Sequence, residues 1–250
     1  MRDYIQKVVP MYMGKIGFKY NKEFLKVYAY LIYTESGQIF LFDTGLNKMF
    51  VTEKNKILQN LSFFIEVDVK KEEFLGDKLK QYGLQKKELQ AVICSHLHFD
   101  HAGGIAEFEN TSVRLLVQKR EYEEAKKLAD GRSFEYKEED FACLEKSENL
   151  VLLESKFLVD GNEMMQCLET YGHSAGHQSL LLQGRHKNML LTGDVAYTRK
   201  QLDEGKISVT PFRKQEALES MAKIQELAKQ CSYVICGHEC DAYAEQEILL

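Results

Sequence analysis

The stretch SHLHFDHAGG, residues 95 to 104, gathers side chains that would not share a core. Three of the chain's seven histidines and one carboxylate fall within six positions: His96, His98, Asp100 and His101. Buried together without partners, these groups would desolvate or repel one another. Neutral imidazoles and a carboxylate are, however, good ligands for zinc-like cations. A solvated strand end would explain a single histidine, whereas this cluster predicts a metal site.

The spacing also predicts how these groups converge. In extended backbone, alternate side chains share a side, so His96, His98 and Asp100 would point the same way. His101 would join them only if the chain turns, and the two glycines of HAGG permit such a turn before the next helix.

Three further donors are expected at strand ends. They are His173 in YGHSAGHQS, Asp194 in LLTGDVAY and His238 in VICGHE, and a glycine precedes each of them. Seven donors are too many for one tetrahedral ion, but they suit two cations about 3.5 to 4 Å apart that share a carboxylate. Zinc is the expected metal, and manganese, iron or cobalt accept the same donors.

The elements that carry these donors alternate between β-rich runs and helices. The expected strands are a hairpin over 26–45, then 91–94, 113–118, 150–154, 157–170, 179–194 and 233–238, and the expected helices are 71–82, 119–130 and 214–230. Residues 130–141 are the least regular part and are expected to form a surface excursion. Because strands outnumber helices, we expect sheets packed together with helices outside.

Composition narrows the class of protein. With 33 basic and 38 acidic side chains and no Lys/Arg stripe, a nucleic-acid partner is not expected. There is no long apolar run and no targeting signal, which predicts a soluble cytoplasmic protein without membrane contact. Two prolines and no low-complexity linker favour one domain over 1–250. The six scattered cysteines are expected to remain reduced thiols.

The order FDTG, HLHFDH, GH, GD and GH resembles the metallo-β-lactamase superfamily over nearly the whole chain. This resemblance implies an α/β fold, a four-layer αβ/βα sandwich, with a two-metal site at one edge of the sheets. By the same resemblance, one metal would be bound by His96, His98 and His173, the second by Asp100, His101 and His238, and Asp194 would bridge them.

Within that superfamily, HLHFDHAGG, GHSAGHQSL and LLTGDVAYT are most similar to the N-acyl-homoserine lactonases. The resemblance implies that Tyr197, three residues after the bridging aspartate, hydrogen-bonds the substrate carbonyl. We expect a metal-bridging hydroxide to attack a lactone or ester, with Asp100 passing a proton to the leaving alkoxide. Asp43 of FDTG is expected to orient a ligand imidazole. The family usually has prolines where Tyr171 and Ala175 stand, so this loop is expected to differ.

Other functions remain open at this stage. Thioesterases such as glyoxalase II share all seven ligands, although no basic cluster for the carboxylates of glutathione is evident. Hydrolysis of another lactone is a further alternative. A non-enzymatic metal-binding module is disfavoured because structural zinc sites are closed and usually contain cysteines. The cysteines near this motif, Cys94, Cys236 and Cys240, are interpreted as packing residues. Oligomeric state is not predicted.

Overall fold

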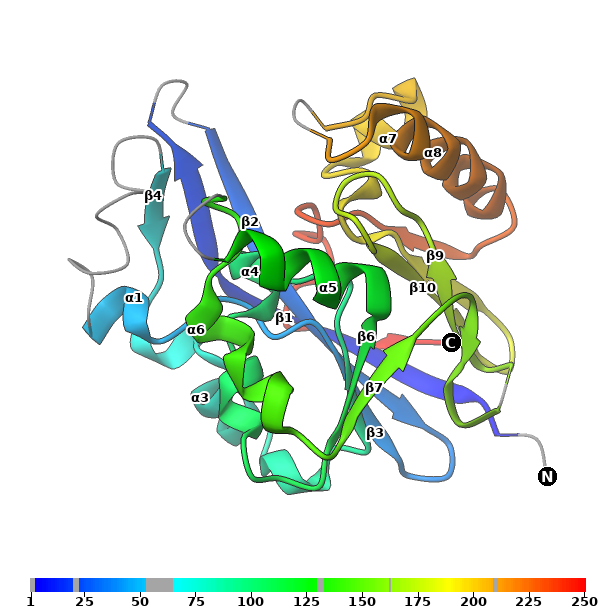
Figure 1. The fold of residues 1–250 in the computed structure, drawn as a ribbon. Helices are drawn as coiled ribbons and strands as arrows, with labels where there is room; N and C mark the ends of the chain where they lie inside the picture. Colours follow the sequence, from blue (N-terminus) through cyan, green and yellow to red (C-terminus); the bar gives the residue numbers. More distant parts are fainter. Residues whose placement is uncertain (1–2, 20–22, 53–64, 130–132, 162, 209–210) are drawn as a thin grey trace.

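The first of two sheets is built mainly from the N-terminal half of the chain (Figure 1). The computed structural model describes residues 3–19, 23–52, 65–129, 133–161, 163–208 and 211–250. Within these residues the strand order is β13-β1-β2-β3-β5-β6-β7, and β4 pairs with β1. The strands are β1 (Ile5–Phe18), β2 (Glu23–Thr34), β3 (Ile39–Phe42), β4 (Ile65–Asp68), β5 (Ala91–Ile93), β6 (Arg114–Gln118), β7 (Leu150–Leu153) and β13 (Ile248–Leu249).

The second sheet has the order β12-β11-β10-β9-β8. Its strands are β8 (Phe157–Leu158), β9 (Met165–Glu169), β10 (Gln178–Gln183), β11 (Asn188–Leu191) and β12 (Tyr233–Ile235). Strand β10 runs antiparallel to β9 and to β11, and β11 runs parallel to β12. The carboxyl ends of β9, β11 and β12 therefore lie at one edge. In the first sheet β3 and β5 are also parallel, so their carboxyl ends share an edge too.

Helices cover the outer face of each sheet. Those beside the first sheet are α1 (Met49–Thr52), α3 (Leu75–Gln81), α4 (Phe99–Ala102), α5 (Lys119–Leu128) and α6 (Glu138–Phe141), and those beside the second are α7 (Arg199–Glu204) and α8 (Lys214–Ala228) (Figure 1). Short 3-10 turns are η1 (Lys71–Glu73), η2 (Lys86–Glu88), η3 (Ile105–Phe108), η4 (Ala142–Lys146), η5 (Val159–Gly161) and η6 (Gly193–Val195). The predicted four-layer sandwich is confirmed.

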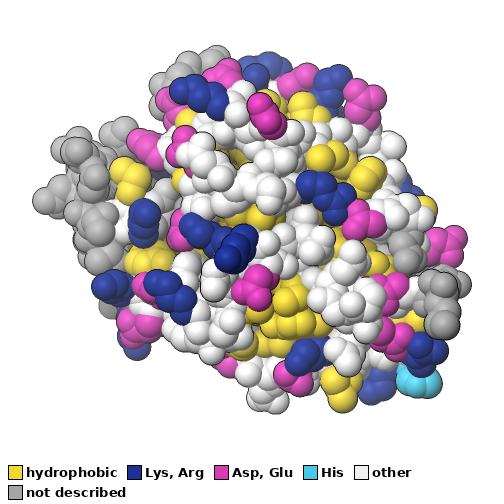
Figure 2. All heavy atoms as spheres, turned by 90° about the horizontal axis from the view of Figure 1, so that it is seen from below, with side chains coloured by type: hydrophobic (Ala, Val, Ile, Leu, Met, Phe, Trp, Pro, Cys, Tyr) yellow, Lys and Arg dark blue, Asp and Glu magenta, His cyan; other side chains and the backbone are white. Residues whose placement is uncertain are grey.

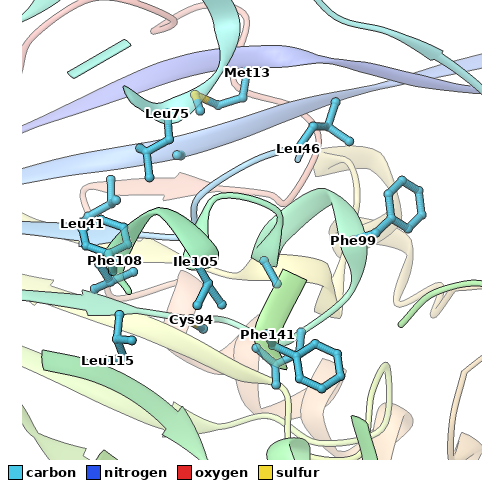
Figure 3. Packing of buried hydrophobic residues seen from close by; sticks show 14 of the residues in the cluster. Met13, Leu41, Leu46, Leu75, Cys94, Phe99, Ile105, Phe108, Leu115 and Phe141 are labelled. Carbon is cyan, nitrogen blue, oxygen red and sulfur yellow. The ribbon is translucent and has the colours of Figure 1, made fainter. Parts of the chain in front are cut away.

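Alternation along the strands creates the layers. In β2, Tyr28 and Tyr30 join the apolar cluster between the two sheets, whereas Ala29 and Leu31 join the cluster under the helices. Side chains of opposite parity are thus buried on both faces of the strand, which is typical of a sheet covered on each side. Figure 3 shows the helix-side cluster, where Phe99 of α4 and other apolar residues pack over the sheet.

Helix α8 covers the second sheet through three side chains at helical spacing, Ala217, Met221 and Ile224, which are buried. This agrees with the helix predicted over 214–230. Leu218 is exposed, because its position lies about a quarter-turn away from this buried stripe.

Residues 130–132 lie outside the described residues. For residues 133–141 the prediction of a surface excursion is wrong. Tyr136, Asp140 and Phe141 are buried, and Phe141 packs in the helix-side cluster (Figure 3). Because most residues of this stretch are charged or polar, the sequence did not indicate that Tyr136 and Phe141 would be buried. Asp140 accepts a hydrogen bond from Asn47 Nδ2 at 2.7 Å, while its Oδ2 is buried without a partner.

Asp140 is expected to give the protein a pH-dependent stability. Burial, assisted by Glu139, raises the pKa of this carboxyl from 3.8 to about 7. Between those pH values the folded chain holds a proton that the unfolded chain loses, so the free energy of unfolding falls as pH rises, by up to about 1.4 kcal/mol per pH unit. Asp140→Asn should remove this slope, changing the difference from the parent chain by as much as about 4 kcal/mol between pH 4 and 8.

Urea unfolding followed across that pH range measures the effect. Asp203→Asn is the matched control, because Asp203 is exposed and forms an ion pair with Arg199 one helical turn away. Superimposable pH profiles for Asp140→Asn and the parent chain would show that this carboxyl does not titrate on unfolding.

The surface carries mixed charge. Figure 2 shows one face, on which basic and acidic side chains are interspersed rather than gathered into regions of one sign. Several charged side chains form ion pairs at the surface, such as Lys119 with Glu154. None of the described helices is both long and apolar enough to pass through a membrane.

Candidate metal centre

The seven predicted donors meet where the carboxyl ends of strands from both sheets come together. The chain leaves β5, passes His96 and enters α4, for which His98 is the N-cap residue. Asp100 and His101 therefore lie on a helical turn. The expected alternation along extended backbone holds no further than His98, and Asp100 joins the group because the chain begins to coil at Phe99.

Three imidazoles form the first group of donors. His96 Nε2 lies 3.0 Å from His98 Nδ1, and His173 Nε2 lies 3.2 Å from each of them. His96 Nδ1 contacts Ser95 Oγ at 2.9 Å, and this contact assigns the proton of that ring to Nδ1. The lone pair of His96 Nε2 then faces two other ring nitrogens, an arrangement that a cation between them would stabilise.

A carboxylate and two imidazoles form the second group. Asp100 Oδ2 lies 3.5 Å from His101 Nε2 and 3.9 Å from His238 Nε2. His238 is held by its other nitrogen, since Nδ1 donates to the carbonyl oxygen of Lys26 at 2.8 Å. All of these donors are buried.

Asp194 lies between the two groups. Its Oδ2 is 3.4 Å from His173 Nε2 and 3.2 Å from His238 Nε2, and its Oδ1 is 3.4 Å from His101 Nε2. Asp194 Oδ1 and His101 Nε2 are both buried without a hydrogen-bond partner in the part of the chain that the structure describes. Buried polar atoms without partners are costly, and a metal ion coordinated by both atoms would remove that cost. The donor set therefore fits divalent cations.

The directions of the pKa shifts separate the imidazoles into the same two groups. Burial and the neighbouring rings hold the pKa values of His96 and His98 well below the ordinary range, and burial lowers that of His173 to about 3. These rings are neutral at pH 7, which is the form that binds metals. Burial also opposes charge on His101 and His238, but the carboxylates of Asp194 and Asp100, joined at His101 by that of Asp43, together outweigh it and raise both pKa values. The second group thus attracts positive charge.

Asp43 orients one imidazole of each group. The sequence predicted this role for Asp43 toward a single ligand imidazole. Its Oδ2 accepts hydrogen bonds from His101 Nδ1 at 2.9 Å and from Ser95 Oγ at 2.8 Å, and its Oδ1 accepts from Ser95 N at 2.6 Å. Because Ser95 Oγ in turn contacts His96 Nδ1, one carboxylate fixes the tautomers of both His96 and His101.

Replacing Asp43 by Asn is expected to weaken metal binding by about ten- to a hundredfold. The amide has only one acceptor oxygen, so its NH₂ group would face a donor from Ser95 or His101. Chelator competition measures the change. Asp77→Asn, on the surface beside Lys80, should bind metal as the parent chain does. Equal affinity in the two variants would exclude an orienting role for Asp43.

Glu121 of α5 is a further organising residue, which the sequence did not reveal. Its fully buried carboxylate accepts hydrogen bonds from Leu97 N at 2.9 Å, Gly176 N at 2.7 Å, Ser174 Oγ at 2.7 Å and Tyr136 OH at 3.0 Å. It therefore ties the loop of His98 to the loop of His173. In the sequence it is one of many charges in KREYEEAKK, and no local pattern distinguishes it.

His177 supports Asp194 through a backbone hydrogen bond. Its Nε2 accepts from Asp194 N at 2.9 Å, and its Nδ1 donates to Thr170 O at 3.1 Å. A side chain at Gly193, whose φ is +54°, would come within 2.5 Å of His177 Nε2, and one at Gly237 within 2.3 Å of Asp194 Oδ1. These two glycines are required for the close approach of the loops. His186 lies in an exposed turn away from the site.

Tyr197 borders both groups of donors. Its ring packs edge-on against His238, with centroids 4.9 Å apart, and against His173 at 5.9 Å. Its carbonyl oxygen accepts a hydrogen bond from His238 N at 3.0 Å, which fixes the two loops together. Burial and the carboxylates of Asp194 and Asp100 raise the pKa of the phenol well above its usual value, so it remains a hydrogen-bond donor at neutral pH.

Comparison with known proteins gives one consistent result. The model of the metallo-beta-lactamase superfamily matches residues 23–238. An N-acyl homoserine lactonase from Bacillus sp is 36% identical over 224 residues, covering 87% of this chain and 82% of that protein. The N-acyl homoserine lactonase AiiA of Bacillus thuringiensis subsp. kurstaki is 34% identical over 223 residues with the same coverage.

Solved structures agree with the sequence matches. The structure of an N-acyl homoserine lactone hydrolase, with the product N-hexanoyl-L-homoserine bound at its catalytic metal center, is similar with a TM-score of 0.80 at 30% identity. The likeness covers 96% of this chain and 95% of that one.

Proposed function

Because this chain belongs to the metallo-β-lactamase superfamily, we propose that it is a dinuclear-metal-dependent hydrolase that opens the lactone ring of N-acyl homoserine lactones. The observation that carries this proposal is the position of Asp194 between two groups of donors, with Tyr197 packed against one histidine of each. The lactone substrate follows from the likeness to N-acyl homoserine lactone hydrolases along most of the chain.

Each donor has a role in this proposal. One cation would be held by His96, His98 and His173 and the other by Asp100, His101 and His238, with Asp194 able to contribute to both. Nitrogen and oxygen donors without cysteine suit zinc, and manganese, iron or cobalt would fit the same set. When bound, such cations supply a water of lowered pKa and polarise the carbonyl of the ester.

The chain's own residues then direct the reaction. Asp43, directly at His101 and through Ser95 at His96, keeps these two imidazoles in the tautomers that leave their inner nitrogens free. The Tyr197 phenol donates a hydrogen bond to the lactone carbonyl oxygen, where negative charge develops as the carbonyl carbon is attacked. The contacts of Asp100 with the two imidazoles use Oδ2, and the other oxygen passes the proton released by the attacking water to the departing ring oxygen.

Exposed aromatic rings near the donors suit the acyl chain of such a substrate. Phe212 is exposed, and its N–H donates to the carbonyl oxygen of His173 at 3.2 Å. Phe134 is also exposed, one residue before Glu135, whose carbonyl oxygen accepts from Phe99 N at 2.9 Å. The segment that bears each ring is thus hydrogen-bonded to a segment that carries metal-binding side chains. There the apolar acyl chain of a substrate can cover the exposed ring.

Offering the metal-loaded protein N-hexanoyl-L-homoserine lactone and S-lactoylglutathione side by side tests the proposal. Acid release from the lactone alone is the expected result. Thiol release from the glutathione ester alone would instead indicate a glyoxalase II-like thioesterase. Stable binding of one metal ion, with neither ester hydrolysed, would indicate a metal-binding module.

A further inference from the structure

Glu135 places a carboxylate at the outer side of the first group of donors. Its Oε2 lies 3.9 Å from His98 Nε2, the ring nitrogen on the opposite side of that imidazole from its contacts with His96 and His173. The side chain of Glu135 is 32% exposed, whereas that of His98 is 8% exposed. Glu135 therefore lies where the buried site meets solvent.

The backbone holds this carboxylate in place. The carbonyl oxygen of Glu135 accepts from Phe99 N, in the first turn of the helix that carries Asp100 and His101. Next to it, Tyr136 packs edge-on against His98 with ring centroids 4.9 Å apart, and its hydroxyl donates to Glu121. The position of Glu135 is thus tied to the same loop as the donors.

Glu135 is linked to the side of the site where Tyr197 lies through two packed imidazoles. His98, which Glu135 contacts, packs against His173 with ring centroids 4.9 Å apart, and His173 packs against Tyr197 at 5.9 Å. After burial, Asp194 and Asp100, Glu135 also contributes to raising the pKa of the Tyr197 phenol. Among the described residues no lysine or arginine forms an ion pair with Glu135. At 3.9 Å its contact with His98 is too long for a hydrogen bond, so its oxygens can accept one from a ligand.

The proposed substrate has one group that requires such an acceptor. In an N-acyl homoserine lactone the amide nitrogen is attached to the carbon next to the lactone carbonyl. When the carbonyl is held at Tyr197, the amide N–H is therefore near by, and burying it without an acceptor would weaken binding. On the basis of the proposed function, we infer that the Glu135 carboxylate accepts a hydrogen bond from this amide N–H and selects lactones that carry it.

The test compares two lactones with the same ring. N-hexanoyl-L-homoserine lactone has the amide, and α-hexyl-γ-butyrolactone has an alkyl chain at the same ring carbon without it. Glu135→Ala should lower kcat/KM for the first by about ten- to a hundredfold, mainly through KM, and change the second by less than about threefold. Glu135→Gln, which retains an acceptor oxygen, should recover part of the loss. Glu138→Ala, an exposed change three residues away, is the matched control.

Product binding gives a second measurement. By calorimetry, Glu135→Ala should bind N-hexanoyl-L-homoserine more weakly than the parent chain does, with equal metal content. Equal losses on both lactones would mean that Glu135 acts by positioning His98, and no loss on either would mean that it does not contact substrate; both results overturn the inference. If the parent chain opens neither lactone, the proposed function itself is overturned, and this inference with it.

Discussion

Asp194→Ala is expected to abolish lactone opening and to leave the chain unable to hold its metal ions together. Asp194 contacts both groups of donors. Without it His173 in one group and His101 and His238 in the other lose the carboxylate they share, so each cation would lose a ligand and part of the negative charge that attracts it. A loss of about 4 kcal/mol in transition-state stabilisation is a thousandfold in rate, and we expect at least that.

Metal content by elemental analysis and kcat/KM on N-hexanoyl-L-homoserine lactone measure the two effects together. Asp203→Ala removes a carboxylate from an exposed ion pair with Arg199 and should behave as the parent chain does. If the alanine variant does not fold, Asp194→Asn retains the shape and tests the charge. A variant with two tightly bound ions per chain and the parent rate would contradict the bridging role.

Tyr197→Phe is expected to lower kcat by about a hundred- to a thousandfold while the metal content stays unchanged. The phenylalanine ring can keep the edge-on packing against His238 and His173, so only the hydroxyl is lost. That hydroxyl is the hydrogen-bond donor assigned to the carbonyl, and its loss leaves the developing negative charge without this partner.

Steady-state kinetics at saturating lactone, with metal content measured on the same sample, checks this result. Tyr233→Phe is the matched control, because its hydroxyl contacts only Lys187 on the surface among the interactions that the structure shows. Unchanged kcat in Tyr197→Phe would remove this tyrosine from the reaction. Loss of metal would show that its role is structural.

The donors themselves could be predicted from sequence because metal chemistry restricts residue type. His96, His98 and Asp100 are recognisable by their spacing alone, and Asp194 and His238 by the glycine that each follows. The residues that hold the donors were less accessible. Glu121 and Glu135 are distant in sequence from the groups they contact, and no sequence feature distinguishes them from exposed acidic residues.

The fold was predicted in its class and in its three longest described helices, α3, α5 and α8, but not at its ends. Strand β1 was not predicted, although it pairs with β2 along most of its length. Pro10 within it argues against a strand by local rules, and only the pairing with a long neighbour overrides them. Strands β4 and β13 are short, and their partners on β1 lie far away in sequence. No local sequence pattern predicts short strands of this kind.

The separation between strand-end donors and the connections around them has a consequence for how this molecule can change. His173, Asp194 and His238 follow strands whose positions are set by the packed layers. Phe134, Glu135 and Phe212 belong to connections between helices, which tolerate insertion and replacement. Substitutions in those connections can therefore change which esters the protein accepts, while the metal-binding residues stay the same. This gives the architecture a high capacity to diversify.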